Sequence, residues 1–176
     1  MTVAVEAHIE GLAALGAAME RMAALGQQPR PIWDAIGQYG ESSTRLRFKS
    51  QTDPDGARWT PSNRAQQSGP GRTLIQKARL LRSMTHNATN SGTSWGTNVK
   101  YAAIHQFGGV IQAKGSFLRF KIGGRFVSVK KVTIPKRSFV GVNAADAQEM
   151  LNVATEVVYN AGRNPKQGYS VGKGGA

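Results

Sequence analysis

The chain contains no cysteine among its 176 residues. This absence excludes disulfide bonds and thiolate metal sites, and it suits a protein made in a reducing cytosol. No apolar run approaches the roughly 20 residues that a membrane helix needs. The first twenty residues carry three glutamates and no Lys or Arg, so the sequence predicts neither a signal peptide nor a membrane protein.

Acidic residues are scarce, and their placement is uneven. The net charge is +13, and seven of the ten acids precede Ala57. Between Gly56 and Asp146 there is no acid, whereas fifteen Lys and Arg fall there. Such a segment needs solvent, the chain's own acidic ends, an acidic neighbouring subunit or nucleic acid to balance it. A solvated basic face is the simplest alternative, but the imbalance favours a partner.

Residues for catalysis are also few. His8, His86 and His105 are the only histidines, and no metal-binding, phosphate-loop or nucleophile-elbow motif is present. Asp53 and Asp55 are better explained as turn formers than as an acid–base pair. His105 could act as a base, but a partly buried hydrogen-bonding role is more typical. We therefore expect no enzyme, no cofactor and no metal.

Three segments have helical character. Residues 4–26 and a segment from Pro31 to Ser50 are expected to form a helical hairpin over 4–50, with Pro31 in the first turn of the second helix. Asn143 is a candidate N-cap for a helix over 143–160, with Asp146 in its first turn. The expected inner faces are Ile9, Leu12, Leu15, Met19 and Met22; Ile32, Ile36, Tyr39 and Leu46; and Ala147, Met150, Leu151, Ala154, Val157 and Val158.

The middle of the chain is expected to hold the strands. Residues 52–72 read as loop, and 73–85 are ambiguous but fit a helix. Two short antiparallel strands are expected over 86–97, a helical turn over 101–107, and a basic hairpin over 116–134 within a sheet region 86–134. The predicted fold is α+β: the helices pack on a small antiparallel sheet with a long basic hairpin. It forms a single domain over 1–161, followed by a flexible basic Gly-rich tail over 162–176.

Three motifs, in order, resemble the phage virion-morphogenesis and tail-completion (tail-terminator) family of Mu-like tailed phages. The first is D-P-D-G-A-R-W-T-P at 53–61, and the second is G-T-N-V-K-Y-A-A-I-H-Q-F-G-G at 96–109. The third, I-P-K-R-S-F-V-G at 134–141, precedes the last helix. The chain departs from the family at Ala78, where Gly often stands, and at Lys136 and Ser138, where Ala and Pro are usual.

The resemblance implies a structural virion protein that forms a homo-oligomeric ring, usually a hexamer. The ring would terminate the tail tube at the virion neck and join it to the head, after assembly in the host cytoplasm. The implied partners are other copies of the chain, the tail tube protein and neck, stopper or connector proteins. The basic charge would in addition allow a passing contact between a ring lumen and phage DNA. The alternatives are another neck component, such as a stopper or adaptor, and a basic nucleic-acid-binding protein.

Two sets of residues are candidates for function. The cations of the hairpin region are candidates for a subunit interface or a ring lumen, or else for a solvated strand pair; they are Arg119, Lys121, Arg125, Lys130, Lys131, Lys136 and Arg137. The motif residues are expected mainly to be structural, with Tyr101, Ile104 and Phe107 in the core, a bend at Gly108-Gly109, and His105 and Gln106 hydrogen-bonded to backbone. Trp59, Pro135 and Phe139 complete this set.

Overall fold

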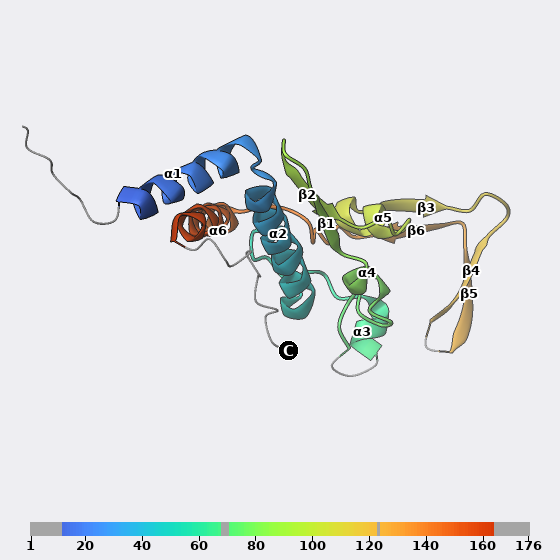
Figure 1. The fold of residues 1–176 in the computed structure, drawn as a ribbon. Coiled ribbons are helices and arrows are strands. Elements are labelled where there is room, and N and C mark those ends of the chain that lie inside the picture. Colours follow the sequence, from blue (N-terminus) through green and yellow to red (C-terminus); the bar gives the residue numbers. More distant parts are fainter. Residues whose placement is uncertain (1–11, 68–70, 123, 164–176) are drawn as a thin grey trace, which may run out of the picture.

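A computed structural model describes residues 12–67, 71–122 and 124–163 (Figure 1). Its elements are α1 (Leu12–Gln27), α2 (Arg30–Ser50), α3 (Asn63–Gln67), α4 (Arg79–Arg82), β1 (Thr85–Ala88), β2 (Thr93–Gly96), α5 (Ala102–Phe107), β3 (Gly109–Gln112), β4 (Leu118–Ile122), β5 (Arg125–Val129), β6 (Lys131–Ile134) and α6 (Ala144–Arg163). The predicted α+β class is confirmed. In the described ranges the strands form three separate two-stranded antiparallel sheets, β1–β2, β3–β6 and β4–β5, instead of one small sheet.

The predicted helical hairpin over 4–50 is wrong. The described part of the first helix, α1, packs on α6, and α6 in turn packs on α2 (Figure 1). Arg21 of α1 donates two hydrogen bonds to the carbonyls of Ala161 and Gly162, at 2.9 and 3.0 Å. The C-terminal helix therefore separates the two helices that the sequence pattern had paired. Residues 4–11 of the expected first helix lie outside the described residues.

Helix α2 has the predicted bounds but a different buried face. Pro31 lies in its first turn. Gln51 caps the C-terminal end with a φ of 61°, and its N–H donates to the carbonyl of Arg47. The apolar stripe expected here is wrong at Leu46, which is 60% exposed. The buried positions are instead Ala35, Gly37, Gly40, Thr44, Arg47 and Phe48.

The two glycines of α2 mark the place where the β1–β2 hairpin packs on the helix. A Cβ added to Gly40 would lie 2.6 Å from Trp95, and one added to Gly37 would lie 2.2 Å from the Thr93 hydroxyl. The hairpin itself has the predicted strands and turn, with His86 opposite Trp95. The absence of side chains at these two positions therefore allows the sheet to approach the helix closely.

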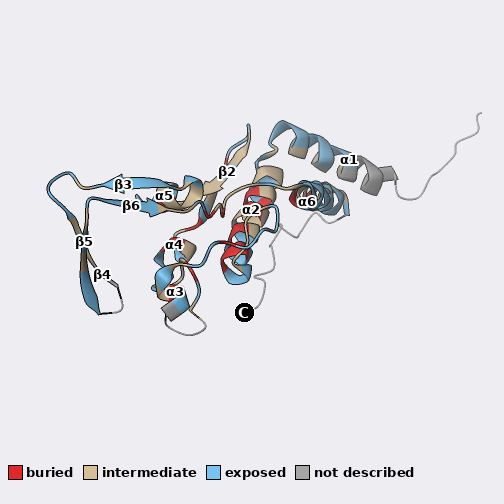
Figure 2. Ribbon diagram, turned by 180° about the vertical axis from the view of Figure 1, so that it is seen from behind, coloured by how far each residue is buried: buried red, intermediate tan, exposed pale blue. Residues whose placement is uncertain are grey.

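The core lies between α2 and the chain segments that run past it (Figure 2). Phe48 packs edge-on against Trp59, with ring centroids 5.4 Å apart, and lies 5.2 Å from the ring of Phe139. The buried hydrophobic cluster contains Phe48, Trp59, Leu80, Met84, Ala102 and Phe139. Residues far apart in the sequence thus meet on one side of α2.

The segment expected as loop before the sheet contains a short helix. The turn at 53–56 forms as expected, with the Asp53 carboxylate accepting the N–H groups of Asp55 and Ala57 and with Gly56 at φ 87°. However, α3 lies inside the expected loop 52–72. The helix expected over 73–85 shrinks to α4, because Leu74 and Ala78 adopt positive φ and Thr85 already begins β1.

The basic hairpin is part of a longer ribbon, here called the arm (residues 109–134). Strands β3 and β6 form its base, and β4 and β5 form its outer part, which turns sharply away from the base in Figure 1. The Ala113 N–H still bonds the Lys130 carbonyl at 2.9 Å, where the two parts meet. The expected single hairpin over 116–134 is therefore incorrect at its end, because 131–134 pairs with 109–112. Pro135 follows β6 and ends the arm.

Helix α6 begins at the predicted cap. The Asn143 side chain accepts the Asp146 N–H at 2.7 Å, and the Asp146 carboxylate accepts the Asn143 N–H at 3.0 Å. The helix continues to Arg163, so the first two residues of the expected tail are helical; residues 164–176 lie outside the described residues. Ala147 and Leu151, expected inside, are exposed.

Candidate functional site

Gln106 joins two of the three sequence motifs. Its side-chain amide donates to the Val140 carbonyl at 2.7 Å and accepts the N–H groups of Phe139 and Val140 at 3.0 and 3.1 Å. The Gln106 amide thus makes the backbone hydrogen bonds that a neighbouring strand would otherwise make to residues 139 and 140. One residue earlier, the His105 carbonyl accepts the Arg137 N–H at 2.7 Å. Helix α5 is therefore fastened to the segment that leads to α6.

The first motif, at 53–61, meets the same segment. The Trp59 indole donates to the Ser138 carbonyl at 2.9 Å, and the Arg137 guanidinium donates to the Thr60 carbonyl at 2.7 Å. Asn143 donates to the Pro54 carbonyl at 2.6 Å. The motif residues thus form a structural junction that places the base of the arm relative to α6.

Three of the motif side chains do not lie where the sequence predicted. Phe107 is 73% exposed and Tyr101 is exposed, so their expected place in the core is wrong, and Ile104 is only partly buried. The helix α5 is a single short turn, and its core contact is made by Ala102. The bend at Gly108-Gly109 does form: both φ values are positive, and a Cβ on Gly108 would lie 2.8 Å from the Lys136 nitrogen.

His105 is partly buried beside Arg137. Its Nδ1 has no hydrogen-bond partner, contrary to expectation, although its ring meets Tyr101 edge-on at 6.1 Å. Burial lowers the pKa of His105 below its ordinary value of 6.5, and the charge of Arg137 lowers that pKa further. The imidazole is therefore neutral at pH 7.

A buried ion pair that sequence reasoning missed connects α2 to α6. Arg47 contacts Asp146 and also donates to the carbonyls of Phe139 and Gly141, at 3.1 and 2.7 Å. Tyr39 and Ser43 donate to the same carboxylate. Burial would raise the pKa of Asp146, but the Asn143 N–H, the Ser43 hydroxyl and the charge of Arg47 outweigh it, so this pKa lies below its ordinary value. Asp146 was predicted only as a first-turn acid.

The arm gathers most of the predicted cations on an exposed surface. Arg119, Lys121, Arg125, Lys130 and Lys131 are exposed on the arm, and Lys136 is exposed just after it. Arg137 is different: it is 5% exposed, and burial lowers its pKa, so it does not share the exposed surface of the other predicted cations. Its partner, the Thr60 carbonyl, lies in the first motif and explains why this arginine turns inward.

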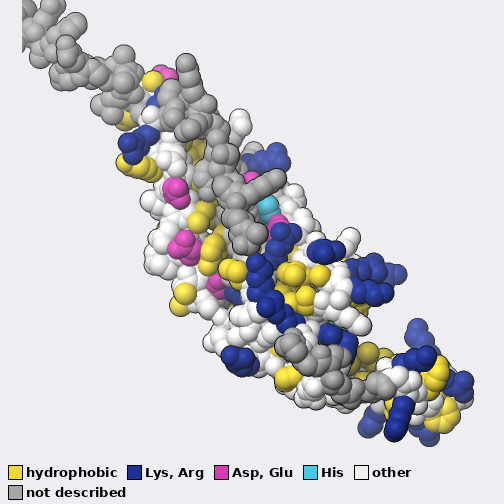
Figure 3. All heavy atoms as spheres, turned by 90° about the horizontal axis from the view of Figure 1, so that it is seen from below, with side chains coloured by type: hydrophobic (Ala, Val, Ile, Leu, Met, Phe, Trp, Pro, Cys, Tyr) yellow, Lys and Arg dark blue, Asp and Glu magenta, His cyan; other side chains and the backbone are white. Residues whose placement is uncertain are grey.

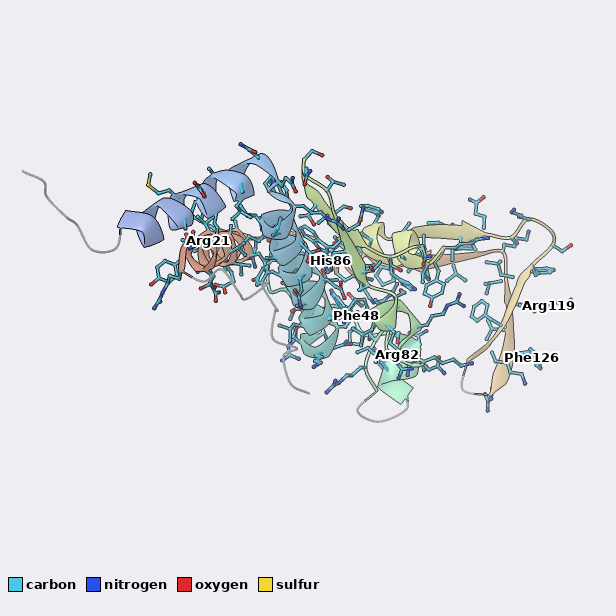
Figure 4. The ribbon with its side chains drawn as sticks, viewed as in Figure 1. Arg21, Phe48, Arg82, His86, Arg119 and Phe126 are labelled. Carbon is cyan, nitrogen blue, oxygen red and sulfur yellow. The ribbon has the colours of Figure 1, made fainter. Side chains whose placement is uncertain are left out.

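The arm also exposes large apolar side chains among these cations. Phe126 is 77% exposed, and Lys121 lies over its ring at 4.5 Å from the centroid. Phe117, Val110 and Ile111 are exposed as well. Figure 4 places Arg119 and Phe126 at the end of the molecule opposite Arg21 and far from Phe48 in the core. A protruding ribbon with this surface is suited to contact another macromolecule.

The opposite end of the molecule is a second exposed surface, where acids lie among Arg21 and Arg163. Leu151 and Tyr159 of α6 are exposed, as are Met19 and Met22 of α1. The exposed acids near them are Glu20 of α1 and Glu149 and Glu156 of α6. Figure 3 shows acids towards this end on the face it draws, and Lys and Arg with apolar side chains at the arm end.

One pocket lies between the two ends, beside α4 and α5. It has a volume of about 440 Å³, and its lining includes Arg64, Lys77, Arg79, Tyr101 and His105 but no carboxylate. In the described ranges, no group of three or more His, Asp or Glu side chains is arranged to hold a metal ion. Within the same ranges, the helices lack the combined length and apolarity required to span a bilayer.

Comparison with known proteins identifies relatives of the chain. The phage virion morphogenesis family matches residues 11–159. A protein described as Mu-like prophage FluMu G protein 2, from Haemophilus influenzae, is 30% identical over 148 residues, which cover 84% of this chain and 91% of the relative. No solved structure matches the chain significantly. The family match includes all three motifs, the arm and most of α6.

Proposed function

This chain belongs to the phage virion morphogenesis family and has a structural role in building phage particles, and we propose that it forms a ring at the head–tail junction. In this proposal the ring is hexameric, terminates the tail tube and joins the tail to the neck of the head. Its partners are other copies of itself, the tail tube protein and the neck or connector proteins. The subunit acts by binding and catalyses no reaction.

The observation that carries this proposal is the division of the molecule into two different exposed ends. The arm is basic and partly apolar, whereas the α1–α6 end carries exposed acids together with Arg21 and Arg163 beside its apolar side chains (Figure 3). A cyclic ring is built from contacts in which one face of each subunit meets a different face of the next. The exposed acids of the α1–α6 end favour contact with a basic arm over the contact of two basic arms. A monomer would leave both surfaces in water.

A passing contact with DNA is a second candidate role for the basic surface. The cations Arg64, Lys77 and Arg79 line the pocket beside α5, away from the arm. A ring with these residues in its lumen would attract phosphates without reading sequence. Its signature would be a DNA affinity that falls steeply with salt, and the same result from an isolated monomer would favour the nucleic-acid-binding alternative.

The test of the proposed function is an amber mutation in the gene, with the products examined by electron microscopy. We expect DNA-filled heads and tails that remain separate, with tails of irregular length, and a plasmid copy of the gene should restore joined particles. Tails of normal length together with heads that lose DNA would indicate a stopper or adaptor instead. Complete infectious particles, or a block before heads form, would contradict a role at the junction.

A further inference from the structure

The outer part of the arm has one apolar face. In the β4–β5 register Leu118 pairs with Val129 and Phe120 pairs with Val127. Directly paired residues of antiparallel strands project on the same side, so these four side chains form one surface, here called the apolar arm face. Arg119 and Lys121 project on the other side, where Lys121 pairs with Phe126.

The apolar arm face has little to pack against within its own subunit. β4 and β5 pack chiefly on each other, and the four side chains remain partly exposed. A two-stranded ribbon alone is marginally stable in water, and a face of this kind needs a helix or sheet to cover it. Figure 1 shows that the outer arm stands away from the helical end of the molecule. The face therefore needs cover from outside the subunit.

Helix α6 carries a surface that matches it. Leu151, Thr155 and Tyr159 recur every four residues, so they form one stripe on the exposed side of the helix. Glu149 and Glu156 lie seven residues apart and form an acidic edge to one side of that stripe, and the same line ends seven residues later at the cation Arg163. The guanidinium of Arg163 lies over the Tyr159 ring, 5.1 Å from its centroid. We call this surface the outer α6 face.

We propose that the apolar arm face of one subunit lies on the outer α6 face of a second copy of this chain. This contact would join neighbouring subunits of the proposed ring, so it rests on the proposed function. Leu118, Phe120 and Val127 would cover Leu151. Arg125, which pairs with Ile122 and projects on the same side of the ribbon, would lie beside Glu156. A two-stranded ribbon is a single layer, and a helix that packs across it supplies the second layer that the ribbon lacks.

The composition of the two faces favours a second copy over nucleic acid as the occupant. A phosphate backbone is recognised by cations and hydrogen-bond donors, and it offers nothing to cover four apolar side chains. The outer α6 face supplies both an apolar stripe and carboxylates, and the apolar arm face in turn supplies apolar side chains and Arg125. The subunit cannot cover its own apolar arm face with its own α6, because the arm and α6 lie at opposite ends of the molecule (Figure 1). Head-to-tail contact between copies would cover both the apolar arm face and the outer α6 face.

Site-specific cross-linking tests this contact, because the chain has no native cysteine. The variant Val127→Cys/Thr155→Cys places one thiol on each proposed face, in assembled tails or purified rings. We expect a bifunctional maleimide to give a ladder of covalent oligomers under denaturing conditions. The matched control is Ser128→Cys/Thr155→Cys, whose arm thiol projects from the opposite side of the ribbon, and it should reduce the ladder at least tenfold. A ring without a Val127-specific ladder would overturn the proposed contact and leave the ring itself intact.

Charge reversal provides a second measurement. One variant reverses the cation on the same side as the apolar arm face (Arg125→Glu), and the other reverses α6 (Glu149→Lys, Glu156→Lys). Each alone should lose assembly, whereas an equal mixture should assemble with the two variants alternating, because every arm then meets an opposite charge. Loss of DNA binding by the arm variant with unchanged ring formation would assign the arm to nucleic acid and reject this proposal. Absence of the wild-type chain from tails would instead refute the proposed function.

Discussion

Arg47 and Asp146 form a buried ion pair, with the guanidinium Nη2 2.5 Å from the carboxylate Oδ2. The pair joins the last turn of α2 to the first turn of α6. Since α6 carries the outer face proposed to receive a neighbour's arm, the pair also fixes the position of that surface relative to the core. Two charges so far from solvent are tolerated because each is satisfied by further hydrogen bonds.

The substitution Asp146→Asn should strongly destabilise the fold. It leaves the Arg47 charge buried without its counter-charge, a change that typically costs about 3–5 kcal/mol of unfolding free energy. Urea denaturation followed by circular dichroism measures this loss. The control is Glu149→Gln on the same helix, which is exposed and should change stability by about 0.5 kcal/mol or less. Equal stabilities for the two variants would show that the ion pair is dispensable.

The pKa of His105 predicts a specific pH dependence. Because its folded-state pKa lies below the ordinary 6.5, the unfolded chain binds the proton first as the pH falls. The stability that neutral His105 contributes is therefore present above 6.5 and is lost as the pH falls through the folded-state pKa. Urea midpoints should fall less with acidification in His105→Gln than in the wild type. Parallel pH dependences of the urea midpoint in the two proteins would contradict the assignment to His105.

Gly40 should not tolerate even one added methyl group. A Cβ there would lie 2.6 Å from the Trp95 ring, and overpacking of this kind costs about 1–3 kcal/mol. Gly40→Ala should therefore lower the melting temperature. The matched control is Gly26→Ala in α1, where nothing lies within 4 Å, and alanine there should raise helix stability by up to about 1 kcal/mol. The same sign of change in both variants would contradict the packing.

These glycines show how far the sequence could predict the fold. Local signals were sufficient for the bounds of α2, the Asn143 cap and the β1–β2 hairpin, since each depends on neighbours in the chain. Gly37 and Gly40 looked like weak points of a helix, because their purpose is set by residues of β1 and β2 more than forty positions later. The pairing of α1 with α6 is likewise a long-range choice that periodicity does not encode.

The candidate site was predictable to a similar extent. The exposed cations of the arm followed from the alternation of β4 and β5, but Arg137 could not be separated from them, because its partner at Thr60 lies 77 residues earlier. Phe107 looked like a core residue from its type alone. The chain reverses at Gly108 immediately after it, and the short α5 turns that side chain outward.

Phe107→Ala separates the two interpretations of that residue. Because the side chain is 73% exposed, the variant should keep its unfolding free energy to within about 0.5 kcal/mol. Phe139→Ala, which empties a fully buried position, should lose about 3–5 kcal/mol. Unfolding monitored by urea compares them directly. A folded Phe107→Ala protein that fails to assemble would place this residue at a subunit contact, whereas an unfolded one would return it to the core.

Removal of the outer arm should separate folding from assembly. Replacement of residues 114–129 by Asn-Gly would leave β3 and β6 joined by a short turn and would remove β4 and β5, which pack chiefly on each other. We expect the melting temperature of the body to change by only a few degrees, since the core cluster contains no arm residue.

The same deletion should abolish ring formation, because it removes the apolar arm face while α6 and its acidic edge remain. Native mass spectrometry of the deletion variant and the wild type measures this directly, and electron microscopy of tails complemented with the variant measures it in the particle. A deletion variant that is folded, monomeric and unable to join heads to tails is the expected result. A variant that still forms rings would mean that the subunits associate through other surfaces, and it would leave the arm free for a different partner.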